Sequence, residues 1–215
     1  MRDLLLKCGV AGPVLFVAAF LVEGATRPGY DAMRTFISQL SLGDDGWTQI
    51  ANFVVCGLLI TAFAFGLRLR MTAGRGATWG PRLIGIVGIG LVIAGVFVTD
   101  PALGYPPGGP AGLTESSSAH GSIHLLGALL VFAGLPAAAI VFYRRFGTVP
   151  ARGGMRMYSL ATAILMLAFF IAANVAAATE GLRGVAGLLQ RASVVTGWAW
   201  ITVLARMSIA PESQL

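Results

Sequence analysis

HGSIHLLGALLVFAGLPAAAIVFYRR, residues 120–145, is the stretch of this sequence that decides the fold. Its centre, residues 123–143, is an apolar run that reaches the roughly 20 residues needed to cross about 30 Å of hydrocarbon as a helix. Two histidines stand at one end of the run and two arginines at the other. Because a helix satisfies its own backbone hydrogen bonds, as lipid demands, we expect this run to span a membrane.

Five further apolar runs have the same character, and together the six runs predict the architecture. Each approaches or reaches the length of a membrane span, and none alternates in the manner of the strands of a membrane barrel. The sequence therefore predicts an all-α fold, a single membrane domain over residues 1–215. This domain is an integral bundle of six transmembrane helices with a short amphipathic helix facing outward. The spans are expected over residues 4–22, 47–67, 83–99, 123–143, 157–178 and 188–207.

The composition is typical of a protein whose main solvent is the bilayer. Hydrophobic residues make up 56% and charged residues 11% of the 215 residues, and the mean hydropathy is +0.80. Soluble domains are about a quarter charged. The net charge of +6 comes from basic residues in short loops between the runs. Membrane topology explains such a pattern better than a nucleic-acid partner, and we expect no nucleic acid to bind.

The distribution of Lys and Arg predicts the orientation. Eleven of these residues lie on the side of the two termini, and four lie on the opposite side. Cytoplasmic loops carry the excess of Lys and Arg, so we expect a multi-pass protein of the bacterial plasma membrane with both termini in the cytoplasm. The first run lacks a clean cleavage site, because Val22-Glu23-Gly24 fits one poorly, and it is expected to be retained as the first helix.

The first outward connection, residues 24–46, carries a helical pattern of apolar residues. These residues are Met33, Phe36, Ile37 and Leu40. We expect a helix over residues 32–42 that lies at the outer interface or folds over the bundle as a lid. The second connection, residues 100–119, is rich in Pro and Gly, which is typical of turns. A flexible connector and a structured part of a cap are the two interpretations of it.

Strongly polar residues gather near the outward ends of the apolar runs. Burying such groups in lipid is costly, so we expect them to turn inward around an outward-facing polar pocket under the cap. Structural pairing is the alternative: a Glu23–Arg27 ion pair, hydrogen bonds between helices, and turn or cap positions. The candidate ligand-binding residues are Glu23, Arg27, Asp31, Asn52, Asp100, His120, His124, Asn174 and Arg191.

The two histidines are spaced to face the same side of a helix, which suits a divalent metal such as zinc. The candidate metal ligands are His120, His124 and Asp100, completed by a further acidic residue or water. Histidines that form hydrogen bonds at a helix mouth are the alternative. A bis-histidine haem within one chain is excluded, because two histidines four residues apart on one helix cannot take opposite axial positions and the sequence has no third.

Several strings carry a resemblance that covers nearly the whole chain. They are RPGYDAMRTFISQLSLGDDGW at residues 27–47, NFVVCGLL at 52–59, TDPALGYPPG at 99–108 and HGSIH at 120–124. With these strings the sequence resembles a bacterial membrane family, domain-of-unknown-function family 998. The resemblance implies a six-helix integral membrane protein and no established activity.

A weaker analogy connects the chain with membrane hydrolases such as alkaline ceramidases, which place a Ser, an Asp and three His around zinc. Ser38 or Ser41, with Asp100 and the two histidines, would take those roles, but the third histidine is missing. The leading interpretation is therefore a protein that binds or transports a membrane lipid or small amphiphilic ligand. A metal-dependent membrane hydrolase and a structural partner of other membrane proteins are the alternatives.

Overall fold

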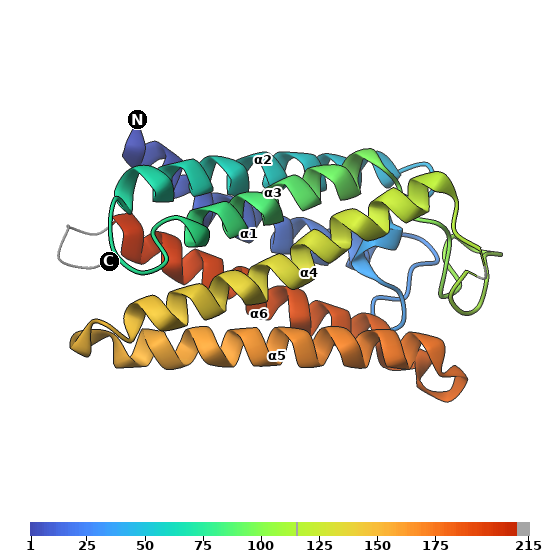
Figure 1. Cartoon of the computed structure of the whole chain (residues 1–215). Coiled ribbons are helices and arrows are strands. Elements are labelled where there is room, and N and C mark those ends of the chain that lie inside the picture. Colours follow the sequence, from blue (N-terminus) through green and yellow to red (C-terminus); the bar gives the residue numbers. More distant parts are fainter. Residues whose placement is uncertain (115, 210–215) are drawn as a thin grey trace.

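The computed structural model describes residues 1–114 and 116–209 and contains six long helices lying side by side (Figure 1). All six are long and apolar enough to cross a membrane. The predicted all-α membrane bundle is confirmed. The helices are α1 (Arg2–Thr26), α2 (Gly46–Arg70), α3 (Trp79–Val96), α4 (Ala119–Phe146), α5 (Gly153–Ala178) and α6 (Ala186–Ile209).

The helices form a ring, in which each packs against the next in sequence and α6 returns to α1. Large side chains fill the ring; Trp200, Phe63 and Phe142 are fully buried. Glycines bring neighbouring helix backbones into contact, because a Cβ at Gly57 on α2 would lie 2.7 Å from the carbonyl oxygen of Gly88 on α3. This close approach through small residues is typical of membrane helix packing.

The observed bounds of the helices differ from the bounds predicted from the apolar runs. α3 covers Trp79–Val96 instead of residues 83–99, and α1 continues to Thr26. α4 begins at Ala119, so both histidines lie in its first two turns. Hydropathy predicts which part of a helix faces lipid, whereas capping residues and proline determine where the helix ends. At the end of α3, for example, Pro101 favours an extended backbone in the residues before it.

The predicted helix over residues 32–42 is wrong in its length and type. Residues 32–35 form turns, and only Ile37–Ser41 are helical, as the short 3₁₀ helix η1. The apolar face is nevertheless directed inward in part, because Ile37 and Leu40 are buried while Met33 is 47% exposed. The segment therefore folds over the bundle as a lid, without the long amphipathic helix.

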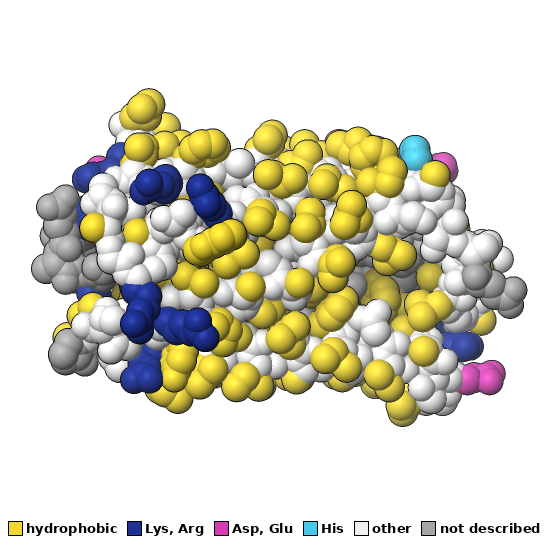
Figure 2. Space-filling model, in the orientation of Figure 1, with side chains coloured by type: hydrophobic (Ala, Val, Ile, Leu, Met, Phe, Trp, Pro, Cys, Tyr) yellow, Lys and Arg dark blue, Asp and Glu magenta, His cyan; other side chains and the backbone are white. Residues whose placement is uncertain are grey.

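Two ends of the bundle differ in chemistry. At one end lies the cap, which we define as residues 27–45, 97–114, 116–118 and 179–185, including the 3₁₀ helix η3 (Glu180–Val185). At the other end, where α1 begins, the Lys and Arg side chains gather on the visible face (Figure 2). The connection there between α4 and α5 includes the 3₁₀ helix η2 (Pro150–Arg152).

Candidate functional site

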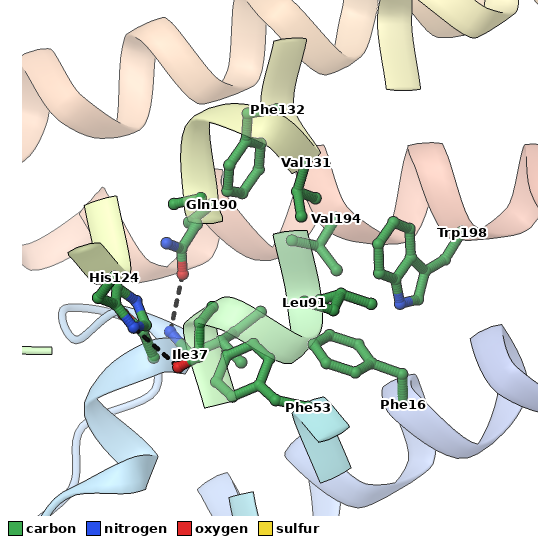
Figure 3. Close-up of a pocket in the computed structure, with 13 residues that line it drawn as sticks. Phe16, Ile37, Phe53, Leu91, His124, Val131, Phe132, Gln190, Val194 and Trp198 are labelled. Carbon is green, nitrogen blue, oxygen red and sulfur yellow. Dashed lines mark hydrogen bonds between the residues drawn. The ribbon is translucent and has the colours of Figure 1, made fainter. Parts of the chain in front are cut away.

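An inner chamber of about 60 Å³ lies between the helices just beneath the cap. Its walls come from α1, η1, α2, α3, α4 and α6, and most of them are apolar (Figure 3). The apolar lining includes Phe16, Phe53, Leu91, Val131, Phe132 and Trp198. A ring of six helices encloses more axial space than these side chains fill, which accounts for the chamber.

A larger vestibule of about 260 Å³ adjoins the chamber. Ser38, His124 and Gln190 line both spaces, so the vestibule continues into the chamber. Leu125 of α4 and Asn174 of α5 line the vestibule and are exposed on the bundle surface. The surface is hollowed between the outer halves of these two helices, which diverge toward the cap (Figures 1 and 2). The vestibule is therefore accessible from the side of the bundle.

His124 is the most deeply buried ionisable side chain of this site, at 3% exposure. Its Nδ1 lies 2.9 Å from the carbonyl oxygens of Ala94 and Phe97, at the end of α3. Those carbonyls lack helical partners because α3 stops at Val96, and His124 acts as their cap. Nδ1 must carry a proton to donate to them, so a neutral His124 keeps its Nε2 lone pair free on the side of the cavity.

Gln190 fixes the lid above the chamber. Its Oε1 accepts a hydrogen bond of 2.7 Å from the backbone N–H of Ile37, and the side chain is 8% exposed. The amide nitrogen is turned away from that bond (Figure 3). Gln39 makes a comparable bridge within the cap, because it donates to the Asp100 carbonyl and accepts from the Ala102 N–H. Neither glutamine was among the predicted site residues, although the position of Gln190 inside an apolar run is itself a polar signal.

Asp100 lines the vestibule and its carboxylate faces the start of α4. Oδ2 accepts a hydrogen bond of 2.9 Å from the Ser118 N–H. A Cβ at Gly121 would collide with the carboxylate, so glycine is required for this approach. The carboxylate thus sits at the positive end of the α4 dipole.

His120 does not share this cavity. It is exposed, and its ring packs edge-on against Phe97 at 5.6 Å between centroids. Among the described residues, His, Cys, Asp and Glu form no group of three or more that could hold a metal ion. Metal binding by His120, His124 and Asp100 therefore stays a prediction, and these residues gain no further protein ligand in the described part of the chain.

Arg27 and Glu23 form the ion pair foreseen as the structural alternative, with 3.1 Å between Nη2 and Oε2. Arg27 also donates to the carbonyls of Leu40, Leu42 and Asp45. The pair therefore connects the end of α1 with η1 and with the start of α2. The Arg27 guanidinium is thus held by backbone carbonyls of the cap and of the start of α2, and the Glu23 carboxylate is held by Arg27.

Arg191 has no carboxylate partner within the described residues and is satisfied by oxygen acceptors instead. It donates to the carbonyls of Thr35 and Gly187 and to the Tyr30 hydroxyl. The Tyr30 hydroxyl in turn donates to the Phe36 carbonyl at 3.0 Å. Burial raises the pKa of Tyr30 to about 12, against the opposing effect of the nearby Arg191 cation. Arg191 and Tyr30 therefore hold the lid to α6.

The remaining candidates have separate positions. Asn52 is buried and donates to the Phe16 carbonyl of α1, a hydrogen bond between helices. Asp31 is exposed and accepts from the Met33 N–H in a local turn. Asn174 is exposed at the mouth of the vestibule. The structure thus brings Asp100, His124 and Asn174 to one cavity, whereas Glu23, Arg27, Asp31, Asn52, His120 and Arg191 lie outside its lining.

A bundle of six membrane-spanning helices with a cavity beneath a structured cap defines a multi-pass membrane protein. The chain matches the family described as "Protein of unknown function (DUF998)" over residues 10–207. Because the match covers nearly the whole chain, the protein belongs to this family. No curated protein and no solved structure matches it.

Proposed function

We propose that the protein binds a lipid or small amphiphile that enters from the outward-facing leaflet between α4 and α5. One observation carries the proposal: a vestibule that is accessible from the side and carries several polar side chains continues into an apolar chamber on the bundle axis. The polar mouth suits a headgroup and the apolar interior suits part of a chain. The vestibule alone approaches the volume of small-molecule pockets, which begins at about 300 Å³.

The free energy of such binding would come mainly from the polar groups. Moving an acyl chain from the bilayer into an apolar chamber gains little, because lipid tails are as apolar as the chamber walls. Hydrogen bonds to Ser38, Gln190 and His124 have no comparable partner in hydrocarbon, so they would decide affinity and selectivity. Transport would require the ligand to leave by a second route, so binding is the simpler proposal.

The test is photolabelling of the purified protein with a photoreactive monoacylglycerol. Ala128 lines both spaces, so Ala128→Phe should obstruct their junction and abolish labelling. Ala133→Phe is the matched control, because Ala133 lies on the same helix and is exposed. Equal labelling of both variants at the wild-type level would refute the proposal, and so would a wild type that is labelled by no photoreactive amphiphile, whether its headgroup is neutral, cationic or anionic.

A hydrolase that acts on such an amphiphile is the second candidate. The observation that favours it is the common position of Ser38 and His124 on the wall of both spaces, with Nε2 of His124 unbound. Ser41 is a poorer nucleophile candidate because its hydroxyl is buried and donates to the Ser38 carbonyl. Release of fatty acid from the monoacylglycerol, lost in Ser38→Ala, would identify this activity.

A further inference from the structure

Among the side chains that the structure describes, a single charged one sets the electrostatic character of the cavity. Among the described residues that line the chamber and the vestibule, only Asp100 is charged at neutral pH if His124 is neutral. Within the described part of the chain, its carboxylate has one N–H partner, that of Ser118, and no Lys or Arg side chain lines either space. The cavity therefore offers a ligand negative charge and no compensating cation.

The arginines at the cap end do not line either space in the described part of the chain, and each of them donates to at least one protein acceptor. Arg27 and Arg191 are held by the carbonyls and side chains described above. Arg34 donates to the Ala111 carbonyl at 2.6 Å, and Arg183 donates to the Ala177 carbonyl at 3.3 Å. Recruiting Arg27 or Arg191 to a ligand would break several bonds that hold the cap together. A phosphate or carboxylate headgroup would thus meet no free guanidinium in the described lining.

The uncharged polar groups of the cavity complete the pattern. His124 and Gln190 are each more than nine-tenths buried and line both spaces. Nδ1 of His124 is bound to carbonyls, which leaves Nε2 as an acceptor, and Asp100 supplies carboxylate oxygen. Asn174 donates its amide nitrogen to the Phe170 carbonyl, which leaves its Oδ1 as a further acceptor. The free acceptors suit a ligand that donates hydrogen bonds, and the Gln190 amide, whose Oε1 is taken by the Ile37 N–H, leaves its N–H donors for an oxygen of the same ligand.

We propose that the ligand's headgroup is a hydrogen-bond donor without negative charge, an alcohol or an amine, and that anionic headgroups are rejected. This inference rests on the proposed function, that the cavity takes an amphiphile. Placing an anion beside Asp100 in a medium of low dielectric constant is repulsive, and its desolvation is not repaid by a cation. An alcohol donates to His124 and Asp100 without that cost, and an amine also gains the attraction of Asp100.

The experiment compares three photoprobes that share one alkyl chain and differ in headgroup: a glycerol ester, a primary amine and a phosphate. Wild-type protein in uncharged detergent should be labelled by the glycerol or amine probe at concentrations about tenfold lower than by the phosphate probe. Asp100→Asn should weaken labelling by the amine, strengthen labelling by the phosphate and leave the glycerol ester unchanged. Asp44→Asn is the control, because Asp44 is exposed in the cap and does not line the cavity.

The outcomes separate the two proposals. If all three probes fail to label the wild type, the proposed function is wrong. If the phosphate probe labels as well as the others, the cavity binds amphiphiles and the headgroup inference is wrong. The wild-type comparison alone decides the inference, so it does not depend on the folding of Asp100→Asn. In that variant, a weaker amine signal assigns the amine arm, and a glycerol-ester signal that dominates in the wild type and persists while the phosphate signal rises assigns the alcohol arm.

Discussion

Arg191 illustrates how the polar residues of this protein divide into two kinds. Its guanidinium is buried among oxygen acceptors of the lid and of α6, and it holds a loop in place. His124 and Gln190 instead use one polar atom to fix a neighbouring element and present the rest of the side chain to the cavity. A polar residue in a membrane span is therefore expected to have a role, but the sequence does not tell whether that role is structural or ligand-binding.

Replacing Arg191 by Met should open the cap. The change removes three hydrogen bonds from a charged donor and leaves buried acceptors unpaired, at a cost on the order of 3 kcal/mol. We expect a lower thermal midpoint in detergent and faster proteolysis within residues 27–45. Arg206→Met is the control, since Arg206 is exposed at the opposite end of α6. Equal behaviour of the two variants would contradict the role given to Arg191.

The two histidines should respond differently to substitution. His124→Ala removes the cap of α3 and leaves the Ala94 and Phe97 carbonyls unpaired, so it should destabilise the protein by about 2 kcal/mol. His120→Ala should change stability by less than about 0.5 kcal/mol, because the side chain is exposed. Thermal unfolding measures both effects.

The same pair tests the metal prediction. If both histidines bind zinc, metal analysis of the purified protein should find about one zinc per chain in the wild type. Each alanine variant should then lose it. Zinc that survives in His120→Ala, or a wild type without zinc after growth with it, would rule out a site that uses both residues.

At the scale of elements, residues 27–45 mark the limit of prediction from sequence. The spacing of their apolar residues was helical, but long-range partners take the backbone groups that an α-helix would need. The Thr35 carbonyl accepts from Arg191, and the Ile37 N–H donates to Gln190, more than 150 positions away. Periodicity contains no information about such partners. The six spans were predictable because lipid imposes an apolar run of fixed length on each of them.

The site was predictable only in part, for a related reason. The candidates Asp100, His124 and Asn174 were recognised because strongly polar side chains stand out in apolar runs or at their ends. Whether each turned toward the axis, toward a neighbouring helix or into the cap depended on helix rotation and on backbone acceptors nearby. Ser38 reaches the cavity wall because the lid folds over the bundle; the apolar pattern of the lid allowed for such folding but did not indicate which of its polar side chains would face the cavity.

The buried face of the lid should be essential and its exposed face tolerant. Leu40→Asp places a charge at a fully buried position, so it should detach the lid, with a cost on the order of 3 kcal/mol. Met33→Asp should have little effect, because Met33 is 47% exposed. Limited proteolysis followed by mass spectrometry should find cleavage within residues 27–45 only in the first variant. Cleavage in neither variant would mean that the lid stays closed without Leu40.

On the scale of the whole molecule, the uneven charge of its two ends has two different causes. The basic end carries Lys and Arg in and beside its loops, as cytoplasmic ends do. The cap end carries four arginines, Arg27, Arg34, Arg183 and Arg191, and each of them donates to at least one backbone carbonyl of the cap or of the end of α5. The fold thus explains why four arginines lie at the cap end. The orientation predicted from the eleven Lys and Arg residues at the opposite end is strengthened by this explanation.

This orientation predicts which positions a membrane-impermeant thiol reagent reaches in intact cells. With Cys8 and Cys56 replaced by Ala, single cysteines at Met33 and Leu182 should be labelled, because both positions are exposed at the cap end. Single cysteines at Thr72 and Ala151, exposed at the basic end, should be labelled only after the cells are permeabilised. None of these substitutions removes a basic residue, so the charge bias that sets the topology is left intact. The reverse pattern would place the cap in the cytoplasm. The cavity would then open toward the inner leaflet, and a ligand would have to come from that side.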